Sequence, residues 1–187
     1  VRYDDNPYYF NDPYQGIPKH GFTKMFEKML ESKNIKIMLN VNYKEIIKDI
    51  KYTRLFVTSP VDEYFNFKYG KLKYRGINYE FEYHQKDDFQ SNSVINYPND
   101  HEYTRITEMK KLTMQKCYGT TICKEFTTWE GEPSYPVPQK EQSELHQKYV
   151  KEAEKLKNVY FLGRLGSYKY LNMDAACKNA LDLYKSL

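Results

Sequence analysis

The sequence predicts an α+β protein, in which an antiparallel β-sheet lies between two flanks that combine helices with strands. Three observations lead to this fold class. Apolar and polar residues alternate along several segments between residues 71 and 138, which is typical of half-buried strands. Apolar residues recur at helical spacing before and after this region. Each flank also carries a short apolar run that predicts a buried strand.

The amino-terminal flank begins with a loop and a helix. Residues 4–18 are rich in Asn, Asp, Pro and Tyr, and they predict an ordered loop. An amphipathic helix follows, because an apolar stripe at helical spacing falls on Phe22, Met25, Phe26, Met29 and Leu30. Residues 35–39 and 54–58 predict buried strands, and residues 61–67 predict a short helical turn.

The middle of the chain predicts the sheet. Apolar and polar residues alternate over residues 72–74 and again over 77–83. The phase slips by one residue at Arg75-Gly76, which predicts a bulge or a hairpin at that point. Further strands are predicted at 94–97, 103–109 and 121–127. Three prolines then predict a rigid, extended crossing, at Pro133, Pro136 and Pro138.

The carboxyl-terminal flank predicts a helix, a strand and a helix. Residues 141–157 are charged on one side and apolar on the other, as in a surface helix. A strand over 159–162 and a final helix over about 174–186 complete the chain. We therefore predict four regions: a loop and helix at 1–34, a connection to the sheet at 35–70, the antiparallel sheet domain at 71–138, and the helix-strand-helix at 139–187.

The composition excludes several classes of function. The 29 basic side chains are nearly balanced by 25 acidic ones, so we expect no nucleic-acid partner. No apolar run reaches 18 residues, so we expect no membrane insertion. Three cysteines without metal spacing indicate reduced thiols in a cytoplasmic protein. The histidines also lack metal spacing, and we expect no metal site at His20, His84, His101 or His146.

One segment of the carboxyl-terminal flank has the features of a ligand site. A strand at 159–162 leads into a glycine turn that contains Arg164, and a helix begins directly afterwards. The free N–H groups and the positive end of such a helix suit an anion or an electron-rich ring. Candidate acids and bases are scarce, which indicates that a cofactor does the bond-making. Because no Gly-x-Gly-x-x-Gly loop is present, the flanks resemble a nucleotide-binding domain whose first half is absent. The chain also lacks an initiating Met, so we expect it to be a piece of a longer protein.

Several motifs together resemble UDP-galactopyranose mutases over nearly the whole chain. They are Val-Arg-Tyr at the start, Tyr-Gln-Gly-Ile-Pro at 14–18, Ile-Asn-Tyr at 95–97, Tyr-Thr-Arg-Ile-Thr-Glu at 103–108, Pro-Ser-Tyr-Pro at 133–136, and Gly-Arg-Leu at 163–165 with the segment that follows it. The resemblance implies an isomerase that uses reduced FAD, through flavin N5, to interconvert UDP-galactopyranose and UDP-galactofuranose without net redox change. It implies a bacterial, cytoplasmic enzyme that supplies galactofuranose for cell-surface polysaccharides such as lipopolysaccharide. The intact enzyme would bind UDP-galactose and UDP, and a homodimer is compatible with the family.

The resemblance also assigns residues. By this resemblance, the flanks correspond to the carboxyl-terminal strand and helix of a Rossmann-like FAD domain, and the antiparallel sheet corresponds to the substrate domain. Substrate binding is expected from Arg2, Tyr14, Asn96, Arg105, Tyr135 and Tyr170. Flavin contacts are expected from Arg164, Leu171, Asn172, Met173, Asp174, Ala175 and Ala176. Arg75 matches a further arginine of the family, with a less defined role.

Two departures from the family pattern leave alternatives open. Many members carry Asp where this chain has Asn172, which can cap a helix but brings no charge. The dinucleotide-binding glycine motif is absent, so we expect the isolated chain to be inactive and not to retain FAD. The alternatives are a stand-alone nucleotide-sugar-binding or structural fragment, and another flavoprotein of the amine-oxidase type. Arg105 alone would most simply form a surface ion pair, with Glu108 or a neighbour.

Overall fold

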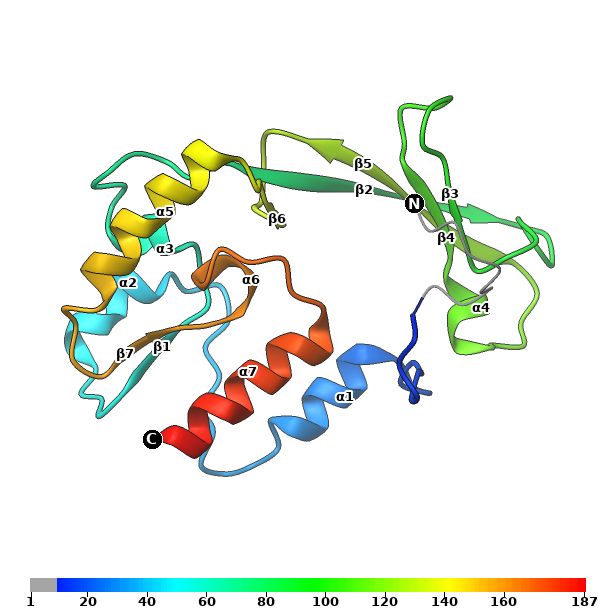
Figure 1. The fold of residues 1–187 in the computed structure, drawn as a ribbon. Helices are drawn as coiled ribbons and strands as arrows, with labels where there is room; N and C mark the ends of the chain where they lie inside the picture. Colours follow the sequence, from blue (N-terminus) through cyan, green and yellow to red (C-terminus); the bar gives the residue numbers. More distant parts are fainter. Residues whose placement is uncertain (1–9) are drawn as a thin grey trace. The chain divides into compact units, whose positions relative to one another are not determined.

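The structure, a computed structural model, describes residues 10–187 and mixes helices with strands throughout (Figure 1). The prediction of an α+β protein is confirmed. The helices are α1 (Gly21–Met29), α2 (Tyr43–Ile46), the 3-10 helix η1 (Ile47–Asp49), α3 (Val61–Tyr64), α4 (Met109–Thr113), α5 (Lys140–Ala153), α6 (Gly163–Gly166) and α7 (Met173–Ser186). The strands are β1 (Leu55–Val57), β2 (Tyr74–His84), β3 (Val94–Asn96), β4 (Arg105–Glu108), β5 (Thr120–Thr128), β6 (Tyr135–Pro136) and β7 (Val159–Phe161).

The strands form two sheets. Five of them lie in the order β3-β4-β5-β2-β6, and this sheet is the antiparallel one predicted for the middle of the chain. Its last pair, β2 and β6, is antiparallel and places Arg75 opposite Tyr135. The other sheet has only β1 and β7, which run parallel with Phe56 opposite Tyr160. The two flanks of the sequence therefore meet in this small parallel sheet.

The chain divides into two compact units. One contains the described residues up to Leu39, together with Phe81–Ile95 and Thr107–Cys123. The other contains Asn40–Glu80, Asn96–Ile106 and Lys124–Leu187. Along the chain the first division follows Leu39, and the other four fall within strands β2, β3, β4 and β5.

Aromatic residues form the core of the second unit. Val61, Leu72, Tyr149 and Tyr168 are buried together, and Tyr149 is completely inaccessible. Its hydroxyl donates to the carbonyl of Gly70 at 2.6 Å and accepts from the backbone N–H of Tyr69 at 3.1 Å. These bonds satisfy the polar tip of a buried tyrosine and fix the loop before β2.

Tyr168 ties the carboxyl-terminal segment to β2 and to the proline-rich crossing. Its hydroxyl lies 2.8 Å from the carbonyl of Lys73 and accepts from the backbone N–H of Val137 at 3.3 Å. Tyr168 itself has a φ of 49°, in the left-handed region. Since a bulky residue seldom adopts that conformation, these contacts must hold it there, and they thereby position the turn between α6 and α7.

A buried carboxylate organises the first unit. The side chain of Glu108 accepts hydrogen bonds from the N–H groups of Phe89 and Gln90, at 3.0 and 3.1 Å, and from the Thr120 hydroxyl at 2.8 Å. Burial favours the neutral acid, but these donors and Lys111 outweigh it and lower the pKa of Glu108. The ionised carboxylate therefore holds the loop before β3 against the start of β5.

Most of the predicted elements are present at nearly the predicted positions. Residues 10–18 lie outside any helix or strand, and α1 occupies the predicted apolar stripe. The short turn after Pro60 is α3. Helices α2, α4 and α6 were not predicted, and each has only four or five residues. Among residues 10–187, no helix combines the length and apolar character that crossing a membrane would require.

The prediction of a buried strand at residues 35–39 is wrong. This segment forms no strand, and its apolar side chains are exposed, up to 78% for Leu39. An apolar run of this kind forms a strand only where a neighbouring strand pairs with its backbone, and no described residue supplies one.

The hairpin considered at Arg75-Gly76 is also absent, because β2 continues without interruption from Tyr74 to His84. Gly76 serves a different purpose. A Cβ atom at this position would lie 3.0 Å from the carbonyl oxygens of both Glu130 and Glu132. The glycine therefore allows the loop after β5 to cross close over β2.

Candidate functional site

Two aromatic rings and an arginine form a cluster in the second unit. The rings of Tyr135 and Tyr170 are nearly parallel, with centroids 5.6 Å apart. The guanidinium carbon of Arg164 lies 4.7 Å from the centroid of each ring. Three residues that the sequence analysis assigned from separate segments are thus brought together, in a cation–π arrangement.

Backbone carbonyls hold the arginine of this cluster. Arg164 donates to the carbonyl of Leu171 through Nε at 3.2 Å and Nη2 at 2.7 Å, and to that of Ser134 through Nη1 at 3.2 Å. The preceding Gly163 has a φ of 69°, which turns the chain sharply after β7. No carboxylate within residues 10–187 forms an ion pair with Arg164, so its charge is available to an anion.

The helix that follows presents free N–H groups. Asn172 is the N-cap residue of α7, but its side chain accepts no hydrogen bond from the helix. The first hydrogen bond of the helix joins the N–H of Ala176 to the carbonyl of Asn172 at 2.9 Å. The N–H groups of the first turn, from Met173 to Ala175, therefore remain for a ligand or water, at the positive end of the helix dipole.

A second arginine lies beside the cluster. Arg75 is the direct neighbour of Tyr135 across the β2–β6 pair, so both side chains emerge on the same face. Its Nη2 donates to the Thr127 hydroxyl at 2.8 Å, and its guanidinium carbon lies 4.1 Å from the centroid of the Trp129 ring. Trp129 is not among the residues predicted from the sequence, although its being the only tryptophan was a usable signal.

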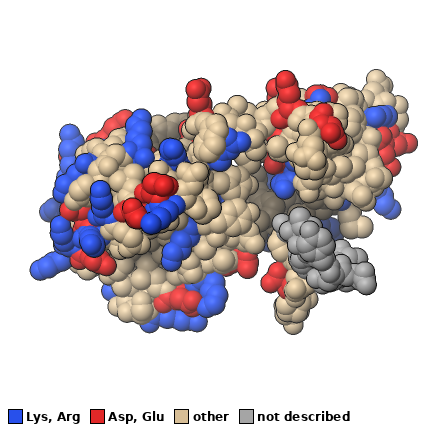
Figure 2. Space-filling view, turned by 45° about the horizontal axis from the view of Figure 1, so that its top comes forward, with Lys and Arg blue, Asp and Glu red and all other residues tan. Residues whose placement is uncertain are grey.

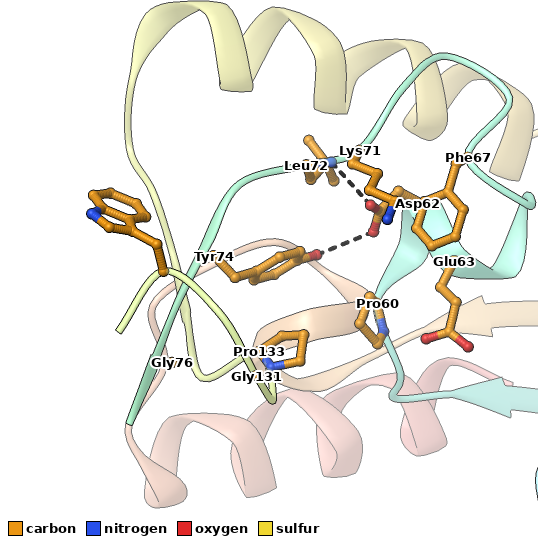
Figure 3. Close-up of a pocket in the computed structure, with 11 residues that line it drawn as sticks. Pro60, Asp62, Glu63, Phe67, Lys71, Leu72, Tyr74, Gly76, Gly131 and Pro133 are labelled. Atoms are coloured by element: carbon orange, nitrogen blue, oxygen red, sulfur yellow. Dashed lines mark hydrogen bonds between the residues drawn. The ribbon is translucent and has the colours of Figure 1, made fainter. Parts of the chain in front are cut away.

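A pocket of about 290 Å³ lies near Arg75, between α3, the start of β2 and the loop after β5 (Figure 3). The side chains of Asp62 and Tyr74 point toward one another in it, with Pro60 and Pro133 on the same side of the pocket. Asp62 is buried and accepts from the N–H of Leu72 at 2.9 Å. Burial raises the pKa of Tyr74, and the nearby Asp62 carboxylate raises it further. The Tyr74 hydroxyl therefore keeps its proton.

Arg105 and Asn96 form a separate polar group in the same unit. Nε of Arg105 donates to the Asn96 side-chain oxygen at 2.9 Å, and Nη1 lies 3.4 Å from a carboxylate oxygen of Glu125. The ion pair considered for Arg105 is present, with the cross-strand neighbour Glu125. Glu108 is not its partner, because residues three apart on a strand point to opposite faces. The Arg105 side chain is 43% exposed, so an anion can reach it.

The remaining predicted residues are not part of these groups. Arg2 lies outside the described residues. Tyr14 belongs to the first unit and is 93% exposed. Within residues 10–187, no three His, Cys, Asp or Glu side chains are grouped to hold a metal ion. Basic and acidic side chains are interspersed over the face shown in Figure 2, without a large area of one sign.

Comparison with known proteins identifies the family. A family model described as UDP-galactopyranose mutase matches residues 1–170. The chain is 38% identical over 186 residues to a probable UDP-galactopyranose mutase of Klebsiella pneumoniae, covering 96% of this chain and 47% of that protein. It is 34% identical to a dTDP-fucopyranose mutase of Escherichia coli, over 96% of this chain and 50% of that protein. A UDP-galactopyranose mutase of Mycoplasma genitalium is 33% identical, over 90% and 46% respectively.

These comparisons show how much of the family's sequence the chain spans and to which family it belongs. The chain spans about half the length of the curated relatives that it matches. The matched region includes most of the residues assigned from sequence, up to Tyr170. The chain belongs to the UDP-galactopyranose mutase family.

Proposed function

We propose that this chain forms the substrate-binding part and one edge of the cofactor site of an enzyme that interconverts UDP-galactopyranose and UDP-galactofuranose. The observation that carries the proposal is the Arg164 cluster, an arginine packed against the stacked rings of Tyr135 and Tyr170 without a neutralising carboxylate among residues 10–187. The intact enzyme would work in the cytoplasm and supply galactofuranose for cell-surface polysaccharide.

The substrate diphosphate requires donors that remain fixed while its bond to the sugar breaks. Arg105 suits this role because it is partly exposed and already oriented by Asn96 and Glu125. The hydroxyls of Tyr135 and Tyr170 and the Arg75 guanidinium are further candidates for phosphate and sugar oxygens. Arg2 and Tyr14 are further candidates for substrate binding, by resemblance to the family.

The residues around α7 fit a flavin. Free N–H groups at Met173, Asp174 and Ala175 suit the electron-rich edge of a reduced ring, and Arg164 adds a positive charge nearby. When bound, reduced FAD would supply a nucleophilic nitrogen to the anomeric carbon, so the protein needs no nucleophile of its own. The described side chains would bind, orient and stabilise charge, which agrees with the scarcity of paired acids and bases.

The test uses the full-length protein that contains this chain. Reduced protein should convert UDP-galactofuranose to UDP-galactopyranose, as followed by chromatography, without consuming oxygen. Oxygen consumption without isomerisation would favour an amine-oxidase-type flavoprotein, and binding of UDP without turnover would favour a non-catalytic role. A parallel assay with dTDP-fucose tests the specificity named for the Escherichia coli relative.

A further inference from the structure

The two sides of the candidate site belong to different segments of the second unit. Arg75 and Tyr135 lie opposite one another on the β2–β6 pair, on the proposed substrate side. Arg164 and Tyr170 belong to the carboxyl-terminal segment that leads into α7, on the proposed flavin side. Isomerisation would require these two sides at a fixed separation, because a misplacement of about 1 Å can lower a rate about a hundredfold. The protein therefore needs contacts that hold the two segments in register.

The hydroxyl of Tyr168 joins these two segments. It donates to the carbonyl of Lys73 at 2.8 Å and accepts from the N–H of Val137 at 3.3 Å. The same N–H of Val137 also donates to the Lys73 carbonyl, at 3.2 Å. Lys73 and Val137 therefore continue the β2–β6 ladder one pair beyond Tyr74 and Pro136, and the hydroxyl enters the ladder at this end.

The hydroxyl lies close, along the chain, to both sides of the site. Its two partners each lie two positions from a site residue, which is Arg75 in β2 and Tyr135 in β6. Tyr168 itself lies two positions before Tyr170. A displacement of Tyr168 relative to the ladder is therefore passed to the side chains of the site over very short stretches of backbone.

The surroundings of Tyr168 keep its hydroxyl in place as a donor. The ring is buried and packs edge-on against the ring of Tyr74, with centroids 5.2 Å apart. Burial raises the pKa of Tyr168, so the hydroxyl keeps the proton that it donates. The φ of 49° is costly for so bulky a residue. A phenylalanine ring would fill the same space, so the hydroxyl indicates a role beyond packing.

We propose that Tyr168 is a positioning residue of the isomerisation, whose hydroxyl fixes the segment of Arg164 and Tyr170 against the β2–β6 pair. The inference rests on the proposed function. A second link joins the same segments, from Nη1 of Arg164 to the carbonyl of Ser134 at 3.2 Å. Arg164 is itself a proposed binding residue, however, whereas the hydroxyl of Tyr168 bonds to backbone groups. Tyr168 can therefore set the separation of the two sides without taking part in binding.

Tyr149 supplies a matched control. It is buried in the same core, and its hydroxyl also makes two backbone hydrogen bonds, with Gly70 and Tyr69. Those bonds fix the loop before β2 and not the carboxyl-terminal segment. Tyr149→Phe and Tyr168→Phe therefore remove the same group and a similar set of contacts. Both should lower the melting temperature by similar amounts, and only Tyr168→Phe should affect the reaction.

The first test compares turnover with binding in the full-length protein. Tyr168→Phe should lower kcat for UDP-galactofuranose at least about tenfold, while the dissociation constant of UDP changes less than about threefold. Rate and binding should separate in this way because each side of the site stays intact and only their separation changes. Tyr149→Phe should leave both quantities within about threefold of the parent. A 4-aminophenylalanine at position 168 restores a donor at the tip of the ring, and should recover most of kcat.

The second test is spectroscopic and does not depend on turnover. The guanidinium carbon of Arg164 lies 4.7 Å from the centroids of the Tyr135 and Tyr170 rings, so their ring currents shift its Nε–H resonance. This resonance can be followed in full-length protein that carries isotope-labelled arginine, and it is assigned with Arg164→Lys. Tyr168→Phe should move the resonance, and Tyr149→Phe should leave it in place.

Four results would overturn the inference. They are equal changes in kcat for the two phenylalanine variants, a dissociation constant of UDP that rises in step with the loss of kcat, an Arg164 resonance that Tyr168→Phe does not move, and a Tyr168→Phe protein that does not fold. If the parent protein does not isomerise UDP-galactofuranose, the proposed function fails. The Arg164 resonance then still decides whether Tyr168 fixes the geometry of the site.

Discussion

Replacing Arg105 by alanine in the full-length protein distinguishes a substrate contact from a surface ion pair. In the structure Arg105 contacts Asn96 at 2.9 Å and Glu125 at 3.4 Å, and its side chain is 43% exposed. A partly exposed pair of this kind contributes at most about 1 kcal/mol to stability. A charge-assisted contact to a diphosphate contributes more, about 1.5–3 kcal/mol.

These magnitudes predict different effects on stability and on activity. Arg105→Ala should lower kcat/KM for UDP-galactofuranose by about tenfold to over a hundredfold. The free energy of unfolding should fall by less than about 1 kcal/mol, and bound FAD should stay. Arg105→Lys should recover only part of the loss, because an ammonium cannot reproduce the planar fork of the guanidinium. Chromatographic turnover, flavin absorbance and urea unfolding measure the three quantities.

Arg54→Ala is a suitable control. Arg54 is also an exposed arginine held by a hydrogen bond, which its Nη2 donates to the carbonyl of Leu187 at 3.0 Å, but it lies outside the proposed site. The Arg54→Ala substitution should therefore leave kcat/KM for UDP-galactofuranose unchanged. If Arg105→Ala leaves kcat/KM at the parent value, or if its loss matches that of Arg54→Ala, Arg105 is only a surface residue and its assignment to the diphosphate is wrong.

Three further predictions concern the cofactor and the fold. The 187-residue chain purified alone should be colourless and bind FAD weakly, and a yellow preparation would contradict this. In the full-length protein, Met173→Pro should raise the energy of the reduced flavin anion and reduce turnover, as measured by midpoint potential and rate. Since Met173 is the first residue of α7 and Asn172 has an extended ψ of 165°, proline fits there and removes one N–H, so unchanged values would make this helix start purely structural. Glu108→Gln should destabilise the protein by about 1.5–3 kcal/mol at neutral pH. The lowered pKa of Glu108 means that its stabilisation is present above the ordinary value of 4.5 and is lost as the pH falls below it, so parent and variant should converge in acid melting experiments.

The sequence predicted elements best where local pattern decides the structure. The stripe at Phe22, Met25 and Phe26 predicted α1 correctly, although these side chains are not buried among the described residues. The apolar run at residues 35–39 also has a clear local pattern, that of a strand. A strand requires a partner, however, and local sequence carries no information about one. The alternation of apolar and polar residues changes phase at Gly76, where the loop after β5 crosses over β2. The sequence around Gly76 does not reveal this cause, because the loop residues lie more than fifty positions later.

The candidate site shows the same limit. Family resemblance named Arg105 and Asn96 separately, and the structure joins them by a hydrogen bond. Glu125 was not predicted as the partner of Arg105, because cross-strand neighbours depend on register, which the sequence did not specify. Similarly, nothing in the sequence indicates that Arg164 packs against both Tyr135 and Tyr170, because Tyr135 comes from β6, some thirty positions before Arg164.

The packing of Arg164 against two rings affects the thermodynamics of ligand binding. Three hydrogen bonds and two aromatic faces already restrain its side chain in the free protein. An arginine loses up to about 2 kcal/mol of rotamer entropy when it is fixed, and here that loss belongs to folding. An anion that binds at Arg164 is therefore spared this cost. Removing either tyrosine ring would make the entropy of binding less favourable, even where every contact in the complex stays the same.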